Sequence, residues 1–133
     1  MTNEMKREID RLASVLYKPG ILTDFGCSES QIDLMKQKCD QFSPGKPICV
    51  VKDWAIWDIK LPQSLPDFAI SLIKADYIIY DELGRFPVGG WVRTTAILSI
   101  HENCIFTTNS TSYILVGRGT RKSVEYQDMM RFF

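Results

Sequence analysis

The sequence of 133 residues has little histidine, few cysteines, no net charge and no long apolar run. His101 is the single histidine, and Cys27, Cys39, Cys49 and Cys104 form no C-x-x-C pair. That spacing excludes a zinc ribbon, and we predict that the chain uses no metal or other cofactor. The apolar runs are far shorter than the ~20 residues of a membrane-spanning helix. We therefore predict a cytoplasmic protein with reduced thiols and no membrane partner.

Charge is balanced over the whole chain but not along it. Sixteen Lys/Arg residues face sixteen Asp/Glu residues, so no overall field attracts the protein to nucleic acid or to an anionic membrane. Residues 85–124, in contrast, hold five Lys/Arg residues against Glu102 alone. An electrostatic partner is therefore expected to bind a local basic patch in the C-terminal part.

Length and composition predict a single domain. A chain of this size buries about two-thirds of its unfolded surface, and 45% of its residues are hydrophobic, so it needs no disulfide or metal to fold. We expect one unit over residues 1–133, with a helical part over residues 1–45 and a mainly β part over residues 46–133.

Three helices are predicted. Residues 4–17 carry apolar side chains at three- and four-residue spacings, and residues 29–41 follow the capping-box pattern Ser28-Glu29-Ser30-Gln31. A third, short helix is expected near residues 66–74, because Pro66 suits a first helical position.

Alternating and β-branched segments predict strands after the first break. They cover residues 48–51, 54–61, 77–80, 91–100, 104–108, 113–116 and 123–126, separated by turn signals. Helices first and strands last indicate an α+β fold. We expect two or three N-terminal helices packed on a C-terminal antiparallel meander sheet, or on a small, partly open β-barrel.

The C-terminal part contains a string of separated motifs, GRF, GGWVRTT and SYILVGRGTRK. Together they resemble an uncharacterised family of short bacterial proteins, a domain of unknown function met in proteobacterial accessory or prophage-like regions. The pattern positions are Gly84, Arg85, Phe86, Trp91, Val92, Arg93, Tyr113, Gly117, Gly119, Arg121 and Lys122, and Gly90 replaces the usual Asp. The resemblance implies no activity, but its setting favours toxin neutralisation or interference with host or phage machinery.

No catalytic residue is predicted. A reactive cysteine needs a base and an orienting group, whereas His101 lies beside the turn Glu102-Asn103 and Cys104 begins the next strand facing the core. We interpret them as a turn histidine and a buried thiol. The segment Gly117-Arg118-Gly119 lacks the spacing of a phosphate-binding loop and is interpreted as a hairpin end.

The basic and aromatic residues are the candidate contacts. The predicted partner-binding set is Arg93, Arg118, Arg121, Lys122, Trp54 and Trp91, whereas Trp57 is assigned to the core. The leading hypothesis is a non-enzymatic protein-binding inhibitor, either immunity- or antitoxin-like or a phage counter-defence protein, that occludes a partner's surface. The alternative is a small-barrel nucleic-acid-binding protein that uses the basic hairpins. The sequence leaves the oligomeric state open.

Overall fold

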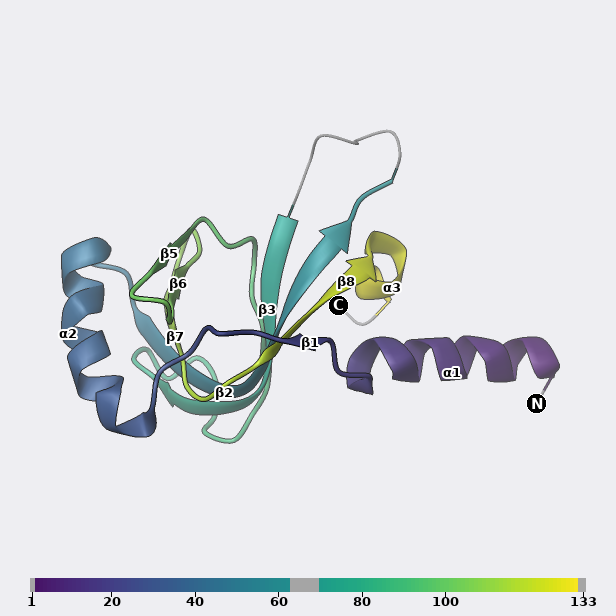
Figure 1. Cartoon of the computed structure of the whole chain (residues 1–133), viewed down its shortest axis with the longest axis horizontal. Coiled ribbons are helices and arrows are strands. Elements are labelled where there is room, and N and C mark those ends of the chain that lie inside the picture. Colours follow the sequence, from purple (N-terminus) through teal and green to yellow (C-terminus); the bar gives the residue numbers. More distant parts are fainter. Residues whose placement is uncertain (1, 63–69, 132–133) are drawn as a thin grey trace.

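The computed structural model describes residues 2–62 and 70–131 (Figure 1). Its helices are α1 (Asn3–Tyr17), a 3-10 turn η1 (Glu29–Gln31), α2 (Ile32–Phe42) and α3 (Tyr126–Met130). Its strands are β1 (Ile21–Leu22), β2 (Ile48–Lys60), β3 (Ile70–Asp81), β4 (Val92–Arg93), β5 (Ser99–His101), β6 (Ile105–Thr107), β7 (Ser112–Leu115) and β8 (Thr120–Glu125).

The first two predicted helices are confirmed. The Ser28 backbone N–H donates to the Gln31 side chain at 2.9 Å, which is the expected capping contact before α2. Helix α1 has no buried residue and projects away from the sheet, at the end of the molecule opposite α2 (Figure 1). Only its last turn packs on the sheet, through the partly buried Val15 and Leu16. The Lys122 ammonium holds this turn by donating to the carbonyls of Val15 and Lys18.

The sheet is mixed, which corrects the expected antiparallel meander. Strand β2 pairs antiparallel with β3 on one edge, and parallel with β7 and then β8 on the other. Strands β5, β6 and β7 do form an antiparallel meander, and the main path of the sheet runs β1-β8-β2-β7-β6-β5. Strands β7 and β8 follow one another along the same edge of β2, and both run in its direction.

The third predicted helix is wrong where it can be compared with the structure. Residues 70–74 belong to β3, whereas residues 66–69 lie outside the described residues. Leu72 and Ile73 are both buried because they point to opposite faces of a strand that is covered on both sides. A short, continuous apolar run fits such a strand as well as a helix, so periodicity alone misassigned it.

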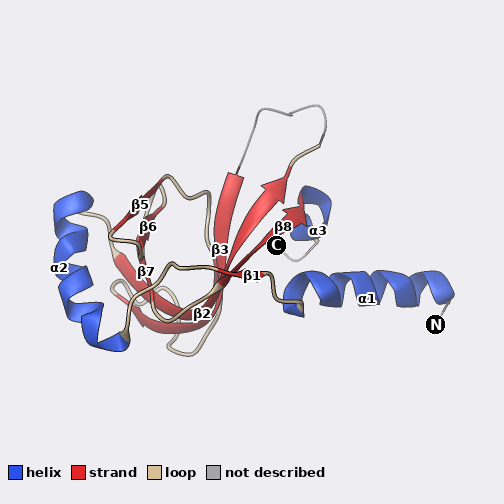
Figure 2. Ribbon diagram, in the orientation of Figure 1, coloured by secondary structure: helices blue, strands red, loops and turns tan. Residues whose placement is uncertain are grey.

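Both faces of the central strands are packed. The inner, concave face holds a cluster that includes Ile56, Ile73 and Phe106, and the outer face holds one that includes Trp57 and Leu72. A third cluster lies where α2 packs near β2 and β7 (Figure 2). The α+β class with a curled, partly open barrel is thus confirmed.

Candidate functional site

Strand alternation divides the predicted basic cluster between the two faces of the sheet. Arg121 is the Cα partner of Ile56 on the inner face, and the next residue, Lys122, is the partner of Trp57 on the outer face. Successive strand residues point in opposite directions. Arg121 and Lys122 therefore point to opposite faces of β8, although both line the groove beside β1.

Residues 117–119 do not form the expected hairpin end. Strands β7 and β8 both run parallel to β2 along the same edge. Residues 117–119 therefore connect the end of β7 to the start of β8 without reversing the direction of the chain. Gly117 has φ +75°, as a tight change of direction requires. Arg118 donates to the Thr23 carbonyl at 2.7 Å and pairs with Asp24 at 3.0 Å, so it fastens the segment before α2 to this connection.

The three tryptophans have different environments. Trp57 is 1% exposed, as predicted for a core residue. Trp54, a predicted partner contact, is 3% exposed and donates from Nε1 to the Val116 carbonyl, so its side chain is not at the surface. It packs in the inner cluster of the curled sheet. Trp91 is 57% exposed and is the one of the three that lies at the surface.

Arg121 belongs to a polar network on the inner face that sequence reasoning missed. Its Nε and Nη2 donate to the two carboxylate oxygens of Asp58 at 2.7 and 2.9 Å, and the Ser71 hydroxyl donates to Asp58 at 2.5 Å. The Arg121 hydrogen bonds lower the pKa of Asp58 against the effect of burial. Alternation along β2 is a sequence signal that places Asp58 on the same face as Ile56. Its partners Arg121 and Ser71 are identified only by the pairing of β2 with β8 and β3.

Two grooves meet at this network. One of about 550 Å³ lies between β1, the following segment with Phe25, and β8; the other, of about 380 Å³, lies between β3 and residues 97–100. Arg121 lines both. Four exposed apolar side chains lie at the rim of the grooves. Ile21 and Leu22 belong to β1, Leu98 comes directly before β5, and Ile100 lies in β5. The grooves thus form the open mouth of the half-barrel.

The outer face carries a row of basic residues. Lys74 of β3 is the Cα partner of Ala55 on one side and of Arg93 on the other. Lys52 lies on the same side of β2 as Val50, because the φ of +51° at Asp53 interrupts the alternation before Trp54. It pairs with Tyr77, with its ammonium 4.5 Å from the ring centroid. We call Lys18, Lys52, Lys74, Arg93 and Lys122 the outer basic face. Only Arg93 and Lys122 of this group were predicted contacts.

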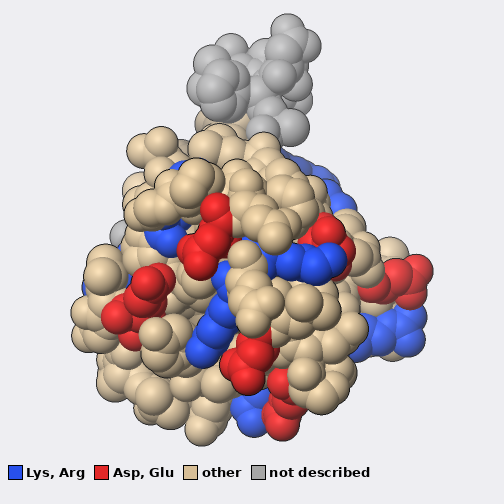
Figure 3. Space-filling model, turned by 90° about the vertical axis from the view of Figure 1, so that its left-hand side faces the viewer, with Lys and Arg blue, Asp and Glu red and all other residues tan. Residues whose placement is uncertain are grey.

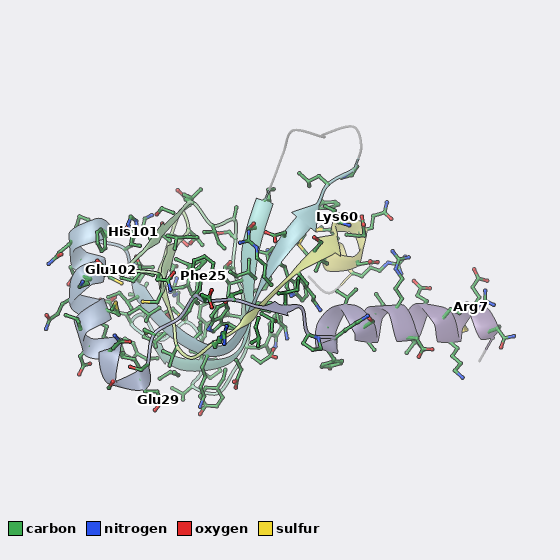
Figure 4. The ribbon with its side chains drawn as sticks, viewed as in Figure 1. Arg7, Phe25, Glu29, Lys60, His101 and Glu102 are labelled. Atoms are coloured by element: carbon green, nitrogen blue, oxygen red, sulfur yellow. The ribbon has the colours of Figure 1, made fainter. Side chains whose placement is uncertain are left out.

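The side chains of His101 and Cys104 have different surroundings. The His101 ring stacks on Phe42 at 4.4 Å and 8°, and its Nε2 lies 3.1 Å from the Ser99 hydroxyl (Figure 4 labels His101 beside α2). Cys104 is fully buried, and burial first, then neighbouring groups that include Cys27, raises the pKa of its thiol to about 12. His101 and Cys104 are instead joined by a backbone turn, in which the Cys104 N–H donates to the His101 carbonyl.

The motif GRF marks a structural contact. Gly84 has φ +64°, and the chain turns there so that Arg85 folds back onto the carboxylate of Asp81. Phe86 packs against the inner cluster. Gly84, Arg85 and Phe86 are three of the positions on which the family resemblance rests.

A sequence model described as a domain of unknown function (DUF6957) matches residues 24–131. The chain belongs to this family. The DUF6957 match contains both grooves except for Ile21, Leu22 and Thr23, and it contains every cation of the outer basic face except Lys18; α1 precedes it. No curated protein and no solved structure matches the chain.

Two further findings limit the chemistry that can be assigned. Among residues 2–62 and 70–131, no three His, Cys, Asp or Glu side chains are grouped closely enough to hold a metal ion. No helix in the same part of the chain is both long and apolar enough to cross a membrane.

Proposed function

We propose that this chain is a non-enzymatic protein-binding inhibitor that covers a surface of another protein. We place it with immunity proteins, antitoxins or phage counter-defence proteins, in the proteobacterial or prophage-like setting that the motif resemblance implies. The observation that supports the binding role is the apolar rim of the half-barrel mouth. Ile21, Leu22, Leu98 and Ile100 are 81, 61, 64 and 45% exposed.

An apolar rim around a groove has a physical consequence. Single exposed apolar residues are ordinary, but a group of them beside a concave surface marks a site where a partner excludes water. Burying each such side chain contributes about 2 kcal/mol before the entropy cost of association. Beneath the rim, the Arg121–Asp58 pair offers both donors and acceptors to a partner's backbone or polar side chains.

The burial and protonation of the cysteine thiols agree with a binding role. The thiols of Cys27, Cys39, Cys49 and Cys104 are buried, and the pKa of each is raised. Nucleic-acid binding has less support, because Arg118 and Arg121 are already engaged by Asp24 and Asp58. Phosphate binding by these two arginines would have to compete with a carboxylate in each case.

The proposal is tested by capture from the native host followed by reconstitution. The bait is the full chain, and its rim variant is Ile21→Asp/Leu98→Asp. The matched control is Leu83→Asp, which changes a residue of similar exposure, 63%, in the turn after β3. We expect one stoichiometric protein with the wild type and with the control, lost with the rim variant, and we expect that protein's activity to fall when the purified pair is mixed. Equal capture by the rim variant, or recovery of nucleic acid alone, would contradict the proposal.

A further inference from the structure

The outer basic face gathers like charges that are distant in sequence. Strands β2, β3 and β4 place Lys52, Lys74 and Arg93 on it, while β8 and the end of α1 add Lys122 and Lys18. Two carboxylates accompany them, Asp53 at the surface and Asp76, which pairs with Lys74. Within residues 2–62 and 70–131, this group of five cations and two anions has an excess of positive charge, whereas the whole chain has no net charge.

Two cations of this face, Lys74 and Lys18, lie close enough to Lys122 to act on its charge. Burial, and then the charges of Lys74 and Lys18, lowers the pKa of Lys122. Lys74 has a side chain only 13% exposed, so solvent screens its charge less than that of a surface lysine. A carboxylate brought to this face would relieve the repulsion as well as gain direct attraction.

Ion pairs occur in other parts of the described chain as well, without such a gathering of cations. Arg85, Arg118 and Arg121 each have their own carboxylate, at 2.7, 3.0 and 2.7 Å. On the side where α2 lies, acidic and basic side chains are interspersed (Figure 3). The excess of cations is therefore a local property of the outer face of β2, β3, β4 and β8.

We propose that the outer basic face binds an acidic surface of a second protein, whose carboxylates approach Lys52, Lys74 and Arg93. This goes beyond the proposed function, because the half-barrel mouth opens on the inner face of the same strands. One partner can then be held in the mouth and another on the outer face. Exposed charges of this kind chiefly raise association rate and select the partner.

The aromatic side chains on this face favour a protein partner over a nucleic acid. Single-stranded nucleic acids bind sheets through bases that stack on aromatic rings. The Lys52 ammonium already lies over the Tyr77 ring. On the neighbouring part of β3, the Lys36 ammonium lies 3.9 Å from the Tyr80 ring centroid. Cations that cover these rings leave a surface suited to carboxylates rather than to bases.

The test compares two probes of the same negative charge, a fluorescent peptide of alternating Asp and Glu and a fluorescent single-stranded oligonucleotide. The face variant is Lys52→Glu/Arg93→Glu. The control, Lys6→Glu/Arg7→Glu, makes the same change in charge on α1, where Arg7 lies near the outer end of the helix (Figure 4). Circular dichroism checks that both variants keep the native fold, and backbone NMR of the wild type locates the bound peptide.

We expect the peptide to bind the wild type, to shift resonances of β2, β3 and β4, and to lose affinity as salt is raised. The face variant should bind it about tenfold more weakly, and the control should stay within about twofold of the wild type. The rim variant Ile21→Asp/Leu98→Asp should retain peptide binding, which separates this test from that of the proposed function. Absence of peptide binding, equal loss in both charge variants, or tighter binding of the oligonucleotide would overturn the proposal.

Discussion

The Arg85 guanidinium and the Asp81 carboxylate form a two-pronged ion pair at the end of β3. Nη2 donates to Oδ1 and Nε donates to Oδ2, at 2.7 and 3.1 Å, and the Asp81 side chain is 0% exposed. The third guanidinium nitrogen donates to the Thr111 hydroxyl at 3.0 Å, which connects this turn to the segment before β7. Burial alone would raise the pKa of Asp81, but hydrogen bonds from Arg85, its charge and backbone donors together lower it.

Replacing Arg85 should destabilise the protein strongly. Arg85→Ala leaves a buried carboxylate without its cation, and breaking a buried pair in this way costs about 3 kcal/mol. Urea unfolding followed by circular dichroism measures the loss as a lower midpoint. The matched control is Arg118→Ala, whose partner Asp24 is 97% exposed. A surface pair of that kind contributes little, so an equal loss in the two variants would refute the importance of burial at Asp81.

Acid should weaken the inner-face network through Asp58. Because Arg121 and Ser71 lower its folded-state pKa, the Asp58 carboxylate stabilises the fold above its unfolded pKa of about 4. That contribution disappears as the pH falls through the lower folded-state value. Asp58→Asn should therefore be less stable at neutral pH and should lose less stability between about pH 5 and pH 2. Urea midpoints measured across this range test the prediction, with Asp24→Asn as the control. Parallel curves for wild type and Asp58→Asn would contradict it.

Features encoded by neighbouring residues were predicted well. The capping box at Ser28, the apolar spacing of α1 and the turn at Glu102-Asn103 depend on contacts within a few residues, and each is present. Glu102 and Asn103 both have positive φ, which suits the tight connection between β5 and β6. The burial of Cys104 followed from the same local pattern.

Features encoded by pairing between distant strands could not be predicted. Whether β8 lies antiparallel to β7 or parallel to β2 depends on contacts between residues 65 positions apart, for example Lys122 with Trp57. The outer basic face has the same origin. Lys74 and Arg93 are ordinary strand residues in sequence, and only the β3–β4 register makes them neighbours. The predicted basic cluster of Arg118, Arg121 and Lys122 is close in sequence instead, and alternation points Arg121 and Lys122 to opposite faces of β8.

A side chain at Gly119 should not fit. Added at this position, a methyl group would overlap both the Trp54 ring and the Trp54 carbonyl oxygen. Gly119→Ala should therefore lower the free energy of unfolding by about 3 kcal/mol and change the tryptophan fluorescence. Gly45→Ala is the control, because Gly45 has φ +85° but no atom within 4 Å of an added Cβ. Its cost should be about 1 kcal/mol, from backbone strain alone. A smaller loss at Gly119 than at Gly45 would show that Trp54 moves aside easily.

The four thiols should be inert until the chain unfolds. Burial is the first cause that raises the pKa of Cys39 to about 11, and of Cys49 and Cys104 to about 12. The thiolate is the reactive form, and at pH 8 a thiol with a pKa of 12 is ionised in about one molecule in ten thousand. Titration with a chromogenic disulfide reagent should therefore show slow labelling of the native protein and rapid labelling of all four thiols in urea. Asn109→Cys, at an exposed turn position, should add one fast-reacting thiol to the native protein. If a native cysteine reacts as fast as this introduced one, its thiol is neither shielded nor suppressed by its surroundings, and the case against cysteine chemistry in this protein fails.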